Sequence, residues 1–189
     1  KELYVLTKND DIDLLVNNAG FGVFGEFIST DINTELNMLD VNIRALHMLT
    51  KFYLKDMVKK DKGTILNVAS SASFMAGPLL SSYYASKSYV YRLSLAINEE
   101  LRRRKSKVQI SVLCPGPVDT KFNERAGVSF SVKALSSSYV AKYALSKLFS
   151  GKTVIIPGFK MKLVKFGVRF LPDKFVARLA YNIQKKKVK

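Results

Sequence analysis

Four short apolar runs constrain most strongly what this chain can fold into. The runs are rich in β-branched residues, do not alternate between polar and apolar positions, and span Ile12–Val16, Thr64–Val68, Val108–Leu113 and Thr153–Ile156. Strands that are buried on both faces of a parallel sheet have this composition, whereas a strand with one face in water alternates. We therefore predict four parallel strands that are ordered in the sheet as they occur in the chain.

The segments between these runs have the periodicity of helices. Apolar residues recur every three or four positions from Thr30 to about Lys60 and from Ser82 to about Lys105, and Ser137–Phe149 has a similar pattern. Strands that alternate with helices predict an α/β fold, a doubly wound parallel sheet with helices on both faces. The length of 189 residues suits one domain over 1–189.

The composition excludes several classes of protein. One cysteine, Cys114, excludes an internal disulfide framework and favours a reducing, cytoplasmic compartment. One histidine, His47, leaves no pair for a zinc site or a His-centred triad, so no metal is expected. No apolar run approaches the roughly 20 residues of a membrane-spanning helix. The chain begins at Lys1, so a missing signal peptide says nothing about targeting.

Positive charge is concentrated at the end of the chain. The formal net charge is +16, and nine Lys, two Arg and one Asp give residues 151–189 a charge of +10. Within a basic C-terminal extension, 157–189, apolar residues alternate with basic ones. A helix of that kind can lie on an anionic membrane. It can equally cover a cleft or a partner subunit with its apolar side, and both alternatives stay open. We expect no nucleic acid partner.

Small and polar residues follow three of the predicted strands. They are Asn17–Gly20, Ala69–Ser71 and Cys114–Pro117. The carboxyl ends of parallel strands meet at one edge of the sheet, and ligands of open α/β sheets bind there. We therefore expect a functional site at this edge.

One pair of side chains near this edge suits proton transfer. Tyr83 and Lys87 are four residues apart at the start of a predicted helix, so they share a face. An ammonium about 4 Å from a phenol, at an effective dielectric of about 20, would lower the phenol pKa from about 10 to near 7. Such a pair is common by chance. Ser70 at the end of the preceding strand can hydrogen-bond a carbonyl oxygen that gains charge, and Asn42 lies on the earlier helix.

Taken in order, these motifs resemble the short-chain dehydrogenase/reductase family. Asn17-Asn18-Ala19-Gly20 is similar to the motif that closes the family's fourth strand. Tyr83–Lys87 is similar to its Tyr-x-x-x-Lys, and Pro115–Thr120 to its Pro-Gly-x-x-x-Thr stretch. Asn42 and Ser70 match its catalytic asparagine and serine. The resemblance covers most of the chain and implies a Rossmann-like fold.

The resemblance also implies an activity, the transfer of a hydride between NAD or NADP and a carbonyl or alcohol substrate. Tyr83 would exchange the proton, Lys87 would lower its pKa and bind the nicotinamide ribose, and Ser70 would polarise the carbonyl. Asn42 would hold a water that links Lys87 to solvent. The remaining cofactor-binding residues would be Asn17, Ala19, Gly20, Pro115, Gly116, Val118 and Thr120. Tyr84 is an alternative to Tyr83, and Ser71 is an alternative to Ser70. The family spacing favours Tyr83 and Ser70.

The chain departs from the family pattern before Asn17. The family opens with a strand, a glycine-rich turn and a helix that bind the pyrophosphate, and nothing similar precedes Asn17. Residues 1–11 resemble the end of the helix that would follow the family's third strand. We expect about three strands and their helices to be missing, together with the residue that selects NAD or NADP. Of the two cofactors, we expect NADP slightly more than NAD. The alternative function is a catalytically incompetent remnant or an interaction module that cannot bind the dinucleotide.

Apolar residues near the expected site bear on the substrate. They are Phe21, Val23, Phe24, Phe74, Met75, Phe122 and Val128. They favour a lipophilic ketone or alcohol, although ordinary anchoring of loops explains them equally well. Because the family commonly pairs through its two long helices, a homo-oligomer is a further expectation.

Overall fold

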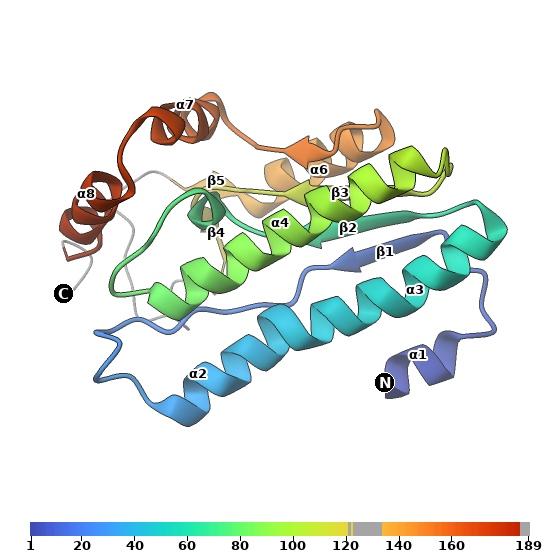
Figure 1. Ribbon diagram of the computed structural model, residues 1–189, viewed down its shortest axis with the longest axis horizontal. Coiled ribbons are helices and arrows are strands. Elements are labelled where there is room, and N and C mark those ends of the chain that lie inside the picture. The colour runs from blue at the N-terminus through green and yellow to red at the C-terminus, as the bar shows by residue number, and fades with distance from the viewer. Residues whose placement is uncertain (121, 123–133, 186–189) are drawn as a thin grey trace.

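The computed structural model describes residues 1–120, 122 and 134–185, and a four-stranded parallel sheet lies at its centre (Figure 1). The strands are β1 (Leu14–Asn17), β2 (Thr64–Val68), β3 (Gln109–Leu113) and β6 (Val154–Ile155). They pair in the order β1-β2-β3-β6, and every pair is parallel. The predicted strands, their order and their direction are confirmed.

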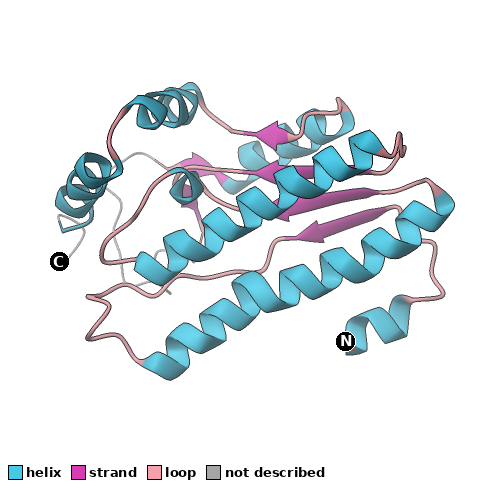
Figure 2. Ribbon diagram, viewed as in Figure 1, coloured by secondary structure: helices cyan, strands magenta, loops and turns pink. Residues whose placement is uncertain are grey.

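Helices cover both faces of this sheet, as predicted (Figure 2). One face carries α2 (Ile32–Leu39), the π-helical turn η1 (Asp40–Ala45), α3 (Leu46–Lys60) and α4 (Ser81–Arg103). The opposite face carries α6 (Ser137–Phe149). The short α1 (Glu2–Thr7) packs against α3. Two elements that the sequence did not predict, β4 (Val118–Asp119) and β5 (Leu135–Ser136), form a small parallel sheet of their own.

The core consists of two apolar layers, because successive residues of a strand point to opposite faces. Val112 packs under α3 and α4, whereas its neighbour Leu113 packs under α6. Ile65 and Leu66 are divided in the same way. This explains why the strands have unbroken apolar sequences.

The sheet is less well covered at β1, which lies at its edge. Val16, on the face that carries α6, is 44% exposed. Leu14 points to the same face and still packs against the α6 cluster. Helix α6 and its neighbours therefore cover Leu14 but leave Val16 of the same strand exposed.

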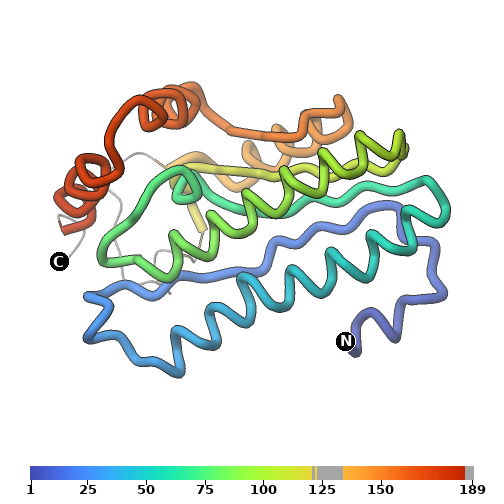
Figure 3. The backbone as a smooth tube through the Cα atoms, viewed as in Figure 1, coloured from blue at the N-terminus to red at the C-terminus, as the bar shows by residue number. Residues whose placement is uncertain are grey.

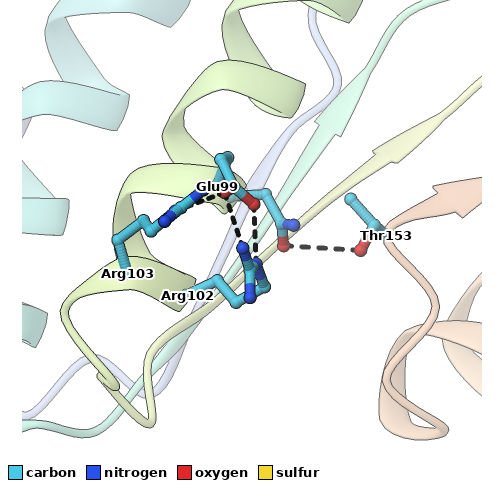
Figure 4. Close-up of polar contacts among 5 residues, drawn as sticks. Glu99, Arg102, Arg103 and Thr153 are labelled. Carbon is cyan, nitrogen blue, oxygen red and sulfur yellow. Dashed lines mark hydrogen bonds and ion pairs between the residues drawn. The ribbon is translucent and has the colours of Figure 1, made fainter.

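Polar contacts within α4 and between α4 and the chain before β6 lie at the end of α4 that is far from the carboxyl edge of the sheet (Figure 4). Glu99 accepts hydrogen bonds from the guanidinium groups of Arg102 and Arg103, and both pairs are exposed to solvent. Thr153 Oγ1 donates to Asn98 Oδ1 over 3.4 Å, which joins the chain just before β6 to α4. Exposed ion pairs of this kind stabilise a fold only weakly.

The basic extension folds back over the carboxyl edge of the sheet (Figure 3). It contains α7 (Phe159–Gly167), the single turn η3 (Val168–Phe170) and α8 (Asp173–Lys185). Helix α7 packs against the 3-10 turn η2 (Ser71–Phe74), which follows β2. In the part of the chain that the structure describes, no helix is long and apolar enough to cross a bilayer.

Candidate active site

A cleft of about 720 Å³ lies at the carboxyl edge of the sheet, where the sequence predicted a site. Its walls come from the loops after β1, β2 and β3, from the first turns of α4 and α6, and from α7 and α8. Most of the predicted site residues line it: Gly20, Ser70, Tyr83, Lys87, Pro115, Gly116, Val118 and Thr120. The structure therefore brings together residues that are up to a hundred positions apart in the sequence.

Ser70 and Tyr83 meet inside this cleft. Ser70 follows the end of β2 and caps η2, where its Oγ accepts a hydrogen bond from the Ala72 amide over 3.1 Å. Tyr83 lies in the first turn of α4, and Ser70 is close enough to its phenol to oppose the rise of the Tyr83 pKa. Burial raises the pKa of Tyr83 to about 12, so the phenol is neutral and carries its proton at physiological pH.

Lys87 lies one turn further along α4 and is buried. Its Nζ donates to the Val68 carbonyl over 3.0 Å and lies 5.9 Å from the centre of the Tyr83 ring. Burial lowers the Lys87 pKa to about 8. The spacing of Tyr83 and Lys87 predicts an ammonium beside the phenol oxygen and a lowered Tyr83 pKa. The structure differs from this prediction. The Lys87 ammonium bonds the Val68 carbonyl, and desolvation of the buried phenol raises the Tyr83 pKa.

Asn42 lies beneath the cleft rather than in its wall, because the π-helical turn η1 projects its side chain into the core. Its Nδ2 donates to the Phe21 carbonyl and to Ser86 Oγ, and its Oδ1 accepts from the Phe21 amide over 3.1 Å. Asn42 thus holds the chain that follows β1. π-Helical turns occur frequently at functional sites.

Gly20 lies where Asn42 and Lys87 converge. A Cβ atom at this position would lie 2.8 Å from Asn42 Oδ1 and 3.0 Å from Lys87 Nζ. Any larger residue would displace one of these polar groups. The missing side chain leaves the floor of the cleft open next to the ammonium.

Two predicted cofactor residues do not line the cleft. Ala19 is exposed next to it, between the lining residues Asn18 and Gly20. Asn17 is buried, and its Nδ2 donates to Thr50 Oγ1 over 3.0 Å and to Asn67 Oδ1 over 2.8 Å. Its side chain therefore ties β1 to α3 and β2, a structural contact that lies behind the site.

The structure separates the rivals from the predicted pair. Tyr84 also borders the cleft, but its hydroxyl accepts a hydrogen bond from Gln184 Nε2 of α8 over 2.6 Å. Ser71 borders the cleft too, and its amide donates to the Pro115 carbonyl. Of the two serines, Ser70 is the one that affects the Tyr83 pKa.

The cleft has an apolar wall, part of which the sequence indicated. Of the seven residues expected there, Phe21, Met75 and Phe122 line it. Phe74 instead packs beneath on Tyr91, Val23 and Phe24 are not among the lining residues, and Val128 lies outside the described residues. Sequence reasoning missed three lining residues from the basic extension: Met161, Val164 and Ile183. The apolar periodicity of the extension was visible, but not which side chains would meet the cleft.

These features suit a nicotinamide dinucleotide. The cleft is large enough for an extended ligand, Gly20 leaves room where a Cβ would block it, and Lys87 and Thr120 offer hydrogen-bond donors. The residues present therefore fit the nicotinamide end of such a cofactor.

The parallel sheet, the helices on both faces and a cleft at the carboxyl edge define a doubly wound α/β protein. The family described as short chain dehydrogenase matches residues 4–128, most of the chain. The chain belongs to this family.

Individual relatives agree with this assignment. Estradiol 17-beta-dehydrogenase 11 from Macaca fascicularis is 28% identical over 174 residues, which is 92% of this chain and 58% of that protein. The chain therefore spans less than two thirds of that relative's length.

Two solved structures share the fold. A short-chain dehydrogenase from Sphingobium yanoikuyae in complex with NADPH has a TM-score of 0.78 at 22% identity, covering 89% of this chain and 68% of that one. A short-chain dehydrogenase/reductase from Burkholderia phymatum in complex with NAD has a TM-score of 0.76 at 20% identity, covering 87% and 68%.

Proposed function

We propose that this chain carries the catalytic residues of an oxidoreductase that transfers a hydride between NAD(P)(H) and a carbonyl or alcohol substrate. The observation that carries the proposal is that Ser70, Tyr83 and the buried Lys87 line one cleft. A phenol, a hydroxyl and an amine that meet in one cleft can hold a carbonyl oxygen and exchange its proton.

The neutral Tyr83 phenol is the proton donor in the direction of reduction. Its raised pKa keeps the proton on the oxygen until an alkoxide of higher basicity develops on the substrate. Ser70 donates a second hydrogen bond to the substrate oxygen and stabilises the negative charge that forms on it. Lys87 bonds the Val68 carbonyl, and its Nζ lies 5.9 Å from the centre of the Tyr83 ring. Its positive charge therefore favours negative charge that develops in the cleft.

A bound nicotinamide would supply or accept the hydride. Lys87 and Thr120 would bond the nicotinamide end, and Gly20 would let the backbone approach it closely. Relatives of known structure were solved with NADPH and with NAD. Our expectation of NADP over NAD is a proposal to be tested with both cofactors.

The substrate that we propose is a lipophilic ketone or alcohol. Part of the cleft wall is apolar, with Phe21, Met75 and Phe122 in it. The name of the relative estradiol 17-beta-dehydrogenase 11 refers to a steroid alcohol, which is a substrate of this class.

The test is a comparison of two adjacent tyrosines. Tyr83→Phe should lower turnover of a steroid or other lipophilic ketone by about 10²–10⁴-fold, the usual contribution of a general acid, and leave the Kd for NADPH within a few-fold. Tyr84→Phe, the matched control, should keep turnover within about tenfold. Consumption of NADPH or NADH, followed by absorbance, gives the rates.

A result in which Tyr83→Phe turns over at the wild-type rate would refute the assignment, and a large loss in Tyr84→Phe alone would transfer the role to Tyr84. The alternative function, an interaction module, predicts that neither dinucleotide binds. Calorimetric titration with NADPH and NADH separates the two functions without a substrate.

A further inference from the structure

Helix α7 has apolar side chains on two opposite faces. Its inner face contributes Met161 and Val164 to the cleft. A second set, at intervals of three and four residues, continues into η3 and points outward: Phe159, Leu163, Phe166 and Phe170. Each of these four is at least 54% exposed. We call this set the outer stripe.

The outer stripe is not needed to attach α7 to the body. Lys165 on the inner side lies over the rings of Phe74 and Tyr91, and α7 packs on η2. The rings of Phe166 and Phe170 contact each other at 5.1 Å between centroids. A row of large apolar side chains that remains exposed after the helix has docked marks an interaction surface.

Helix α8 has three distinct sides. Val176, Ala180 and Gln184 are buried against the body, where Gln184 bonds Tyr84. A second side presents Phe175, Leu179 and Ile183, each at least 46% exposed. A third side, at the same helical spacing, presents Lys174, Arg178 and Lys185. Both helices of the extension thus offer exposed apolar residues next to basic ones.

The charge of this surface identifies its partner. Residues 159–185 contain seven Lys and Arg side chains and a single carboxylate, Asp173. Within residues 1–120, 122 and 134–185, no carboxylate lies within ion-pair distance of these seven cations. A second copy of this chain would bring the same positive charge. An anionic phospholipid surface offers both an apolar interior and negative headgroups.

We infer that α7, η3 and α8 dock this protein on an anionic phospholipid bilayer. The exposed aromatic and aliphatic side chains enter the boundary between headgroups and acyl chains, while basic side chains that point away from the body, such as Lys174 and Arg178, contact the headgroups. Since no described helix spans a bilayer, this contact is interfacial.

The docked helices also border the cleft. Met161 and Val164 of α7 and Ile183 of α8 line it. A lipophilic substrate dissolved in the bilayer would therefore reach the cleft along these helices, a consequence that rests on the function proposed above. The docking itself stands on the exposed residues and their charge.

The experiment is co-sedimentation of the purified protein with vesicles at low salt. Vesicles of phosphatidylcholine with about 30% phosphatidylserine should retain at least about tenfold more protein than vesicles of phosphatidylcholine alone, because each nearby Lys or Arg favours an anionic surface. Added salt should weaken the binding. Equal recovery in the supernatant with both vesicles would overturn the inference.

Two matched pairs of variants locate the surface. Phe166→Ser with Phe170→Ser should reduce vesicle binding by about tenfold or more, whereas Phe149→Ser on α6, which removes a Phe that is 71% exposed, should not. Lys160→Glu with Lys174→Glu should abolish the preference for anionic vesicles, whereas Lys51→Glu with Lys55→Glu on α3 should retain it.

All four variants change exposed positions, and circular dichroism checks that they fold. Equal losses in the control and test pairs would overturn the inference, since binding would then follow overall charge or hydrophobicity. Concentration-dependent dimers that Phe166→Ser with Phe170→Ser disrupts, without vesicle binding, would also overturn it and indicate a second copy as the partner.

Discussion

Lys87 and Tyr83 show how much of this site the residue types could predict. The spacing of four and the strand-end position of Ser70 predicted that these side chains meet, and all three line one cleft. The predicted direction of the Tyr83 pKa was wrong, because burial of the phenol raises this pKa and the Lys87 ammonium bonds the Val68 carbonyl, and both depend on tertiary geometry that no spacing reveals. The side chain of Asn17 does not line the cleft, since it bonds Thr50 and Asn67, contacts that the sequence alone does not reveal.

The lowered pKa of Lys87 predicts a specific dependence of stability on pH. Burial lowers this pKa from 10.5 to about 8, so between these values the unfolded chain binds more protons than the native protein. Stability therefore rises with pH in this window. The free energy of unfolding should increase by about 2 kcal/mol between about pH 7.5 and 9.5 relative to Lys87→Met, which lacks the titrating group.

Urea unfolding of both proteins at the two pH values measures this difference. Tyr83 and Cys114, whose pKa values burial raises to about 12, are present in both proteins, so their titration cancels. A difference that stays constant with pH would show that Lys87 titrates normally in the native state.

At the scale of elements, periodicity predicted the regular helices and missed the irregular turns. Ser137–Phe149 is α6 with the predicted bounds, and the helix predicted from Ser82 begins one residue earlier. The π-helical turn at Asp40–Ala45 interrupts what the sequence presents as one continuous helical pattern. Local sequence does not specify such a turn; the packing of Asn42 beneath Phe21 accompanies it.

The loop between η2 and α4 gives a prediction at this scale. Gly77 is buried, and a Cβ there would lie 2.3 Å from the Tyr84 ring, which α8 fixes through Gln184. Gly77→Ala should lower the free energy of unfolding by about 1–3 kcal/mol, the usual cost of overpacking. It should also loosen α8, because Tyr84 must move.

Gly167→Ala at the end of α7 is the control, since a Cβ there meets nothing within 4 Å. Alanine favours a helix over glycine by up to about 1 kcal/mol, so this variant should be neutral or slightly more stable. Denaturant unfolding compares the two, and hydrogen exchange in α8 reports the loosening. Equal effects of the two substitutions would contradict the role given to the contact between Gly77 and Tyr84.

At the scale of the whole molecule, the unbroken apolar runs were enough to predict the parallel sheet and its order, because only strands buried on both faces need them. The course of the basic extension could not be predicted in this way. Its sequence fitted both a cover for the cleft and a membrane surface. In the structure its inner residues, such as Met161, form part of the cleft, while others, such as Phe166, remain exposed.

The open edge of the sheet predicts how residues 1–189 behave when they are expressed alone. In the described sheet β1 has a strand on one side only, and Val16 is exposed on a face that α6 leaves uncovered. An unpaired strand edge beside an exposed apolar side chain is a template for pairing between molecules. We expect these residues to self-associate, and to do so less when Val16 is replaced by Lys, since charge on an edge strand opposes pairing.

Leu6→Lys is the matched control for Val16→Lys. Leu6 on α1 is 80% exposed, so its substitution adds the same charge and removes a similar apolar side chain away from the sheet. Light scattering during size-exclusion chromatography should show a lower average mass for Val16→Lys than for Leu6→Lys or the unmodified chain. If both substitutions lowered the mass equally, net charge would control the association. If the unmodified chain were monomeric, the edge of β1 would be protected by some other feature of the fold.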